Sequence, residues 1–200
     1  MSAPLSSLTV SVGSEPETID PALNSAVDGA IYIGHLFEGI YTYDANGALK
    51  LGVAKSATPS ADGKVWTIVL KDNLFWSDGK PLVAEDFVYA WKRAAAEATA
   101  SPYAYLITDN VELDKTVAKD AKTIVLTLKF NVPFIKSLLA FPTFMPVRKD
   151  VVENKDGSAN ESWTLSPKTM VTNGMYKLSK RVQDDVIEMM EAVLTAMWAT

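Results

Sequence analysis

The sequence predicts a mixed α/β fold, because alternating strands, an amphipathic helix and tight turns follow one another along the chain. Residues 64–70 (KVWTIVL) and 122–130 (KTIVLTLKF) both alternate between apolar and other side chains, which is typical of strands with one buried face. A helix is expected from about Ala84, because apolar side chains recur there at helical spacing. The expected buried face of that helix consists of Phe87, Val88, Trp91, Ala94, Ala95 and Ala98.

Length, charge and composition exclude several classes of protein. The 200 residues suit one domain or two small ones, and 48% hydrophobic content is enough for a sizeable core. A net charge of −5 argues against a nucleic-acid-binding protein, which normally carries a basic stripe. There is no cysteine, and His35 is the only histidine, so it is expected to be structural. Without a nucleophile–base or metal-ligand spacing, the sequence predicts neither an enzyme nor a cofactor.

The first 50 residues predict a strand, a loop, a helix and a hairpin. Residues 8–12 (LTVSV) alternate as a strand does, and the two prolines within residues 13–21 favour an ordered loop after it. Asp28 is the expected N-cap of a helix that reaches Phe37. Residues 40–43 then read as a strand, with residues 44–47 (DANG) as its turn.

The middle of the chain predicts further turns and the start of the long helix. Residues 60–64 (SADGK) read as a hairpin turn, and Asp78-Gly79 as a tight turn. Glu85 and Asp86 would oppose the positive end of the helix dipole. Val83, however, has no side-chain acceptor, so about 1 kcal/mol of capping stabilisation is expected to be missing.

The last third predicts short elements and a tail of uncertain type. Residues 135–141 favour a short apolar helix, residues 141–147 a stiff extended connector with two prolines, and residues 148–153 another short helix. A turn at 173–174 precedes a strand over 176–178. The tail could be a strand with a frayed end, but its composition favours a helix. The apolar stripe of that helix would be Val186, Met190, Val193, Leu194 and Met197.

Several segments together resemble one family. Residues 75–91 (FWSDGKPLVAEDFVYAW) are closely similar to the signature of extracytoplasmic solute-binding proteins of the oligopeptide, dipeptide and nickel type. These proteins are the ligand-capturing subunits of ATP-driven (ABC) importers. Other segments similar to the same family are EPETIDP (15–21), FEGI (37–40), ASPYA (100–104), FPTFMPV (141–147) and VTNGMYKL (171–178). One departure is Val83, where the family usually has threonine.

The resemblance implies a fold and a division into domains. It predicts a fold like the type II periplasmic-binding proteins, present as part of the large lobe with a smaller α+β subdomain inserted in it. The large-lobe portion would comprise residues 1–37 and 148–200, and the inserted subdomain residues 38–147. The resemblance is expected to stop near Ile187. We therefore expect a truncated, N-terminal portion of such a protein, with a last dozen residues foreign to the fold.

The resemblance also implies a function and a site. The chain would be the substrate-capturing, oligopeptide-binding part of an importer, with a peptide ligand and membrane permease subunits as partners. It would lie outside the cytoplasm, lipid-anchored in its precursor. Alone it is expected to bind peptide weakly or not at all, and to self-associate through exposed lobe surface. The alternative is a ligand-sensing or protein-interaction module. The ligand-binding residues would be Asn24, Ser25, Ala26, Val27 and Tyr103.

Overall fold

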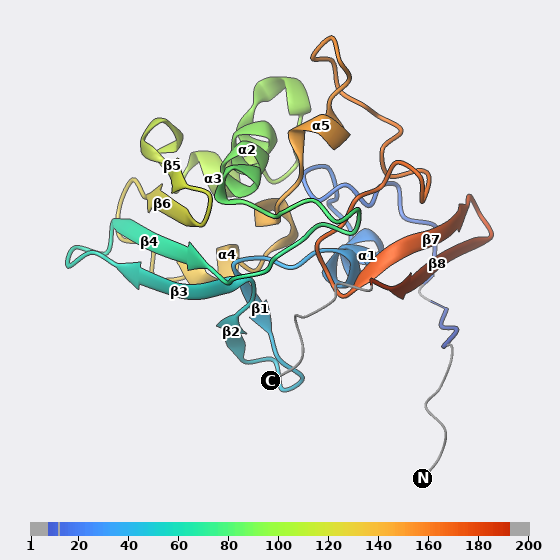
Figure 1. Cartoon of the computed structure of the whole chain (residues 1–200), viewed down its shortest axis with the longest axis horizontal. Helices are drawn as coiled ribbons and strands as arrows, with labels where there is room; N and C mark the ends of the chain where they lie inside the picture. Colours follow the sequence, from blue (N-terminus) through green and yellow to red (C-terminus); the bar gives the residue numbers. More distant parts are fainter. Residues whose placement is uncertain (1–7, 12, 193–200) are drawn as a thin grey trace.

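The computed structural model describes residues 8–11 and 13–192 and confirms the mixed α/β class (Figure 1). Strands form antiparallel sheets of two, four and two strands, with short helices between them. The α-helices and strands are α1 (Val27–Leu36), β1 (Tyr41–Tyr43), β2 (Leu49–Leu51), β3 (Ala54–Pro59), β4 (Val65–Leu70), α2 (Ala84–Ala95), α3 (Ala104–Thr108), β5 (Val117–Asp120), β6 (Thr123–Thr127), α4 (Ile135–Leu138), α5 (Lys149–Val152), β7 (Tyr176–Val182) and β8 (Val186–Glu191). Single 3-10 turns occupy Glu97–Thr99, Leu113–Lys115 and Pro142–Phe144.

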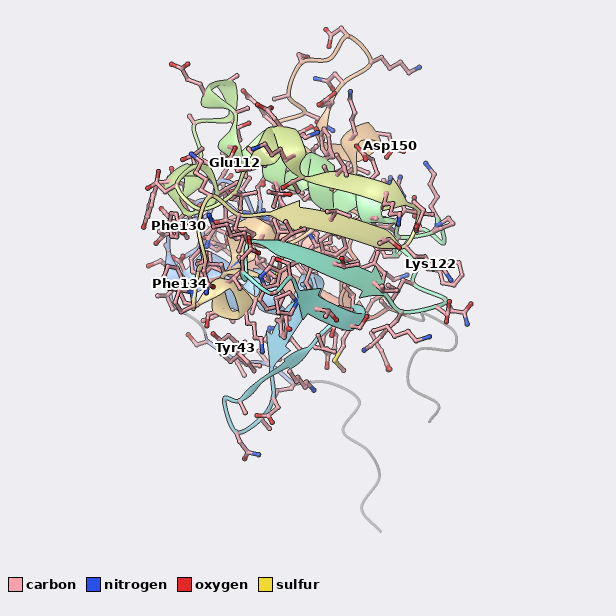
Figure 2. The ribbon with its side chains drawn as sticks, turned by 90° about the vertical axis from the view of Figure 1, so that its left-hand side faces the viewer. Tyr43, Glu112, Lys122, Phe130, Phe134 and Asp150 are labelled. Carbon is pink, nitrogen blue, oxygen red and sulfur yellow. The ribbon has the colours of Figure 1, made fainter. Side chains whose placement is uncertain are left out.

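The four-stranded sheet, ordered β3-β4-β6-β5, is the frame on which α2 packs. Its register places Trp66 opposite Leu126 and Ile68 opposite Ile124, so the apolar faces predicted for both strands lie side by side and are buried. The strand predicted over residues 122–130 is too long, so its last apolar residue, Phe130, does not join the buried face. Strand β6 ends at Thr127, and Phe130 then lies exposed at the opposite end of the sheet from Lys122 (Figure 2).

Helix α2 begins where the sequence predicts, with only half of a capping box. Val83 makes no side-chain cap, but the Asp86 carboxylate accepts the Val83 N–H at 2.9 Å and the Trp76 indole N–H at 3.0 Å. Burial nevertheless raises the pKa of Asp86, against the lowering effect of these two bonds. At the other end, the predicted burial of Ala98 is wrong, because α2 stops at Ala95 and Ala98 is exposed.

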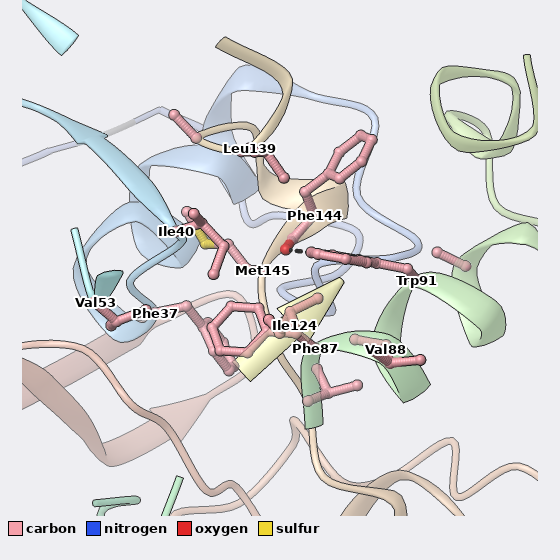
Figure 3. Close-up of a cluster of buried hydrophobic side chains, with 14 of the residues drawn as sticks. Phe37, Ile40, Val53, Phe87, Val88, Trp91, Ile124, Leu139, Phe144 and Met145 are labelled. Carbon is pink, nitrogen blue, oxygen red and sulfur yellow. Dashed lines mark hydrogen bonds between the residues drawn. The ribbon is translucent and has the colours of Figure 1, made fainter. Parts of the chain in front are cut away.

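Trp91 connects α2 to the segment that follows α4 (Figure 3). Its indole is fully buried, and its N–H donates to the Phe144 carbonyl at 2.8 Å. The rings of Phe87 and Phe144 lie against it at centroid distances of 6.2 and 6.0 Å. The expected extended connector over 141–147 is therefore partly wrong, because Pro142–Phe144 is a 3-10 turn that aims the Phe144 carbonyl at Trp91.

A side-chain amide joins two segments that are far apart in sequence. The Asn173 amide accepts the Glu38 N–H at 3.2 Å and donates to the Glu38 carbonyl at 2.9 Å, while the Gly174 N–H donates to the Leu36 carbonyl at 2.9 Å. A Cβ on Gly174 would overlap that same backbone, so only glycine permits the approach. Asn173 and Gly174 therefore hold residues 36–38 and 173–174 together.

Two predictions for the first 30 residues need correction. Residues 8–11 form no strand, because no described strand pairs with them and Leu8 and Val10 remain exposed. Asp28 is not the N-cap: Ala26 holds that position, and the Asp28 carboxylate accepts the Gly29 N–H within the first turn.

The tail is a strand rather than a helix over its described part. Val186–Glu191 pairs with β7 as β8, because main-chain pairing with a neighbouring strand outweighs the helix propensity of Glu and Met. Val186 and Met190 of the predicted helical stripe thus belong to β8. Its other members lie outside the described residues: Val193, Leu194 and Met197.

Candidate functional site

The segment 24–27 runs from a turn into the first residue of α1. Ser25, Ala26 and Val27 are exposed, and Ala26 is extended, with φ −118° and ψ 156°. Asn24 is buried instead, and its side-chain amide donates to the Ala26 carbonyl at 2.9 Å. A Cβ on Gly29 would overlap the Asn24 side chain, so glycine makes room for it. Residues 25–27 are therefore exposed with small or medium-sized side chains, while the Asn24 amide points inward and, with the Ala30 N–H, occupies the Ala26 carbonyl.

Tyr103 comes from the other end of the predicted site and meets this segment. It immediately precedes α3, and its hydroxyl lies a long 3.4 Å from the Ser25 carbonyl, towards which it donates. Its ring and that of Phe141 pack edge to face at a centroid distance of 5.2 Å, and the exposed Tyr105 ring lies 6.2 Å away. The fold thus brings together two of the sequence-predicted site regions, which are 78 residues apart.

A second residue of the same ASPYA segment holds the loop more firmly. The buried Ser101 hydroxyl donates to the Ala22 carbonyl at 2.5 Å. The chain reaches this point through Ala100, whose φ of 51° is a left-handed conformation that is unfavourable for residues other than glycine. The segment around Tyr103 therefore contacts the 22–25 loop at two points, one buried and one exposed.

A buried ion pair joins the start of this loop to helix α2. No pattern in the sequence predicted that these two residues would pair. The Asp20 carboxylate accepts two hydrogen bonds from the Arg93 guanidinium, at 3.0 and 2.7 Å. It also accepts the Ala22 N–H at 2.9 Å and the Trp163 indole N–H at 3.0 Å. Burial alone would lower the pKa of Arg93, but the Asp20 carboxylate raises it, so the guanidinium stays charged.

The chemistry available at this surface is recognition by backbone and aromatic groups. An exposed segment that is extended at Ala26 and lies beside a tyrosine hydroxyl suits an extended polypeptide that adds as a strand. Within residues 8–11 and 13–192, no group of three or more His, Asp or Glu side chains is placed to hold a metal. Nor is any helix in this part of the chain long and apolar enough to cross a bilayer.

A separate shallow depression of about 340 Å³ involves none of the predicted site residues. It lies between the Asp78 turn and the start of β7, with lysines at positions 168 and 177 in its lining.

Comparison with known proteins identifies the family. The model of "Bacterial extracellular solute-binding proteins, family 5 Middle" matches residues 48–192, which carries the similarity past Ile187 to the end of β8. The chain is similar to the periplasmic oligopeptide-binding proteins OppA of Salmonella typhimurium and Escherichia coli, with 37% and 38% identity over 189 residues. Each alignment covers 88% of this chain and 34% of the relative.

A solved structure agrees with this result. The crystal structure of Haemophilus influenzae OppA in complex with the peptide RPPGFSPFR superposes with a TM-score of 0.84 at 34% identity. The match covers 92% of this chain and 37% of that one, so the chain spans about a third of the length of the relatives it matches. The residues that the family model covers and the shared fold lead to one conclusion: this chain belongs to the bacterial extracellular solute-binding proteins, family 5.

Proposed function

We propose that this chain is the N-terminal part of the substrate-capturing subunit of an ABC importer for oligopeptides. The observation that carries the proposal is the meeting of the Tyr103 hydroxyl with the exposed backbone at Ser25. Relatives of known ligand class support it, since the proteins to which the chain is similar are named as oligopeptide-binding. The proposed role is binding and delivery, with no chemical step.

In this proposal a peptide lies extended along residues 24–27, with its backbone paired to theirs. Asn24 contributes through its main chain, because its side chain is turned inward. The hydroxyl of Tyr103 loses little by leaving the Ser25 carbonyl, because 3.4 Å exceeds the length of a strong O–H···O bond. Ser25, Ala26 and Val27 are small or medium-sized, so they leave room for varied peptide side chains.

We further propose the cellular setting that the family implies. The protein would act outside the cytoplasm, lipid-anchored in its precursor, and deliver peptide to membrane permease subunits. Residues 1–37 and 148–200 would form part of the large lobe, and residues 38–147 the inserted subdomain. Asn173, which ties residue 38 to the second of these segments, lies at the proposed boundary.

The 200-residue chain alone is proposed to bind peptide weakly, with a dissociation constant on the order of 1 mM, which corresponds to only about 4 kcal/mol of binding free energy. Tight small-ligand sites enclose most of their ligand. Here the proposed contact residues Ser25–Val27 are exposed, so a peptide on them would leave much of its own surface in water. Exposed apolar side chains such as Phe134 and Met175 also support self-association, which sedimentation velocity at several concentrations would detect.

A thermal-shift titration with a pool of two-to-five-residue peptides tests the proposal. At about ten times the dissociation constant, the ligand should add about 1.4 kcal/mol, or about 3–5 °C in a chain of this size. Tyr103→Ala should abolish the shift, whereas the matched neighbour change Tyr105→Ala should leave most of it. Equal effects of the two changes, or no shift at about 10 mM peptide, would contradict the proposed site.

A further inference from the structure

The Asp20–Arg93 pair ties the loop that leads to residues 24–27 to the rest of the molecule. Asp20 belongs to the EPETIDP segment, and Arg93 to the last turn of α2, 73 residues later. Their side chains are 3% and 12% exposed, and the two hydrogen bonds between them are parallel. A bidentate pair of this kind fixes direction as well as distance, which a single point contact does not.

The same carboxylate and its own backbone shape the loop. One Asp20 carboxylate oxygen accepts the Ala22 N–H, and the Asp20 carbonyl accepts the N–H groups of Leu23 and Asn24 at 3.1 and 2.9 Å. The other carboxylate oxygen accepts the Trp163 indole N–H. The turn over 20–24 therefore takes its shape from Asp20, and Asp20 takes its position from Arg93 and Trp163.

We infer that Asp20 and Arg93 are positioning residues, which hold the backbone of Ser25–Val27 in the position and orientation that an incoming peptide strand needs. The inference rests on the proposed function of that segment. Arg93 also lies on the helix that leads towards Ser101 and Tyr103, so the pair sets the two sides of the site relative to each other. Preorganised backbone groups bind better, because the ordering cost is already met in the free protein.

The molecule offers a matched control in a second buried arginine. Arg148 donates to both oxygens of Asp78, at 2.9 and 2.7 Å, and to Asp150, and its side chain is 9% exposed. Among the described residues it forms no hydrogen bond or ion pair with the 20–27 loop. Arg148→Lys and Arg93→Lys keep the charge and remove the planar fork, so both should destabilise the fold, but only Arg93→Lys should loosen the loop.

Amide hydrogen exchange under native conditions separates these outcomes. In Arg93→Lys, the N–H groups of Ala22, Leu23 and Asn24 should exchange about tenfold faster relative to core amides of β4, and in Arg148→Lys they should not. Asp20→Asn keeps an acceptor for the Ala22 N–H and removes the charge, so it should raise the exchange rates of these loop amides by an intermediate amount. It replaces Arg93→Lys in the test if that variant does not fold. An unchanged loop in Arg93→Lys, or an equal relative rise in Arg148→Lys, would overturn the inference.

The peptide affinity of the same variants adds a measurement that a general loss of stability does not change. Arg93→Lys should weaken peptide binding about tenfold, the cost of one misplaced backbone hydrogen bond, while Arg148→Lys should leave it unchanged. A looser loop with unchanged affinity would refute the positioning role and leave the proposed function standing. If the unaltered chain binds no peptide, the proposed function fails, and the exchange result alone decides whether the pair holds the loop.

Discussion

Trp91→Phe should be among the most costly conservative changes in this chain. The substitution removes the indole N–H and leaves the Phe144 carbonyl buried, with no second donor among the described residues. An unpaired buried carbonyl costs about 1–3 kcal/mol. The smaller ring also gives up about 50 Å² of buried apolar area, about 1 kcal/mol at ~25 cal/mol/Å². The sum is about 3 kcal/mol.

Urea unfolding followed by far-ultraviolet circular dichroism would measure this loss. The midpoint should fall at unchanged slope, and the melting temperature should drop by about 6–12 °C. Trp66→Phe is the matched control, since its indole donates at 3.2 Å to the Gly63 carbonyl in a turn that water can reach. It should cost about 1–2 kcal/mol, because the buried ring loses a similar area, worth about 1 kcal/mol, while water can replace the lost hydrogen bond. If Trp91→Phe cost no more than Trp66→Phe, the assigned role of the Phe144 bond would be wrong.

Three further predictions concern single sites. A hydrogen bond from Arg148 lowers the pKa of Asp150 from 3.8 to about 2. Because the folded-state pKa lies below the unfolded one, this stabilisation is complete above about pH 4 and is lost as the pH falls towards 2. Asp150 is more than half exposed, so an acid titration of the free energy of unfolding should show a loss of only about 1 kcal/mol. Asp150→Asn should not show this loss. The same loss in the variant would refute the role given to Asp150. Asn173→Ala should cost about 2–3 kcal/mol in urea unfolding, because both main-chain groups of Glu38 lose their partner; a cost below about 0.5 kcal/mol would show that water replaces the amide. Gly34→Ala should stabilise by about 0.5–1 kcal/mol, since Gly34 lies within α1 with open space where a Cβ would sit; a lower melting temperature would contradict this.

Local patterns predicted the fold well where residues that are neighbours along the chain decide the structure. The alternation in β4, the Asp78-Gly79 turn and the start of α2 all follow from neighbours along the chain. The prediction failed where a distant partner decides. Residues 8–11 alternate as a strand does but have no described partner strand, and Val186–Glu191 has a helical composition but pairs with β7. No local pattern shows whether either segment has a partner strand in the fold.

The candidate site shows the same division. Segment 24–27 and Tyr103 came from motif resemblance, and the structure shows that they meet at Ser25. Periodicity could not reveal this meeting, since it depends on the path of the chain between them. The Asp20–Arg93 pair was missed because charged residues in loops and at helix ends are usually solvated, and only the three-dimensional structure shows this pair buried.

The most direct test of the proposed peptide surface is a residue-by-residue map of peptide binding. Nuclear magnetic resonance titration of the ¹⁵N-labelled chain detects binding even at a dissociation constant of about 1 mM. The amide shifts should concentrate at residues 24–27 and around Tyr103, and should saturate with a single dissociation constant. Shifts that gather instead around Lys168 and Lys177 of the shallow depression, or that spread evenly over the chain, would contradict the proposed binding surface.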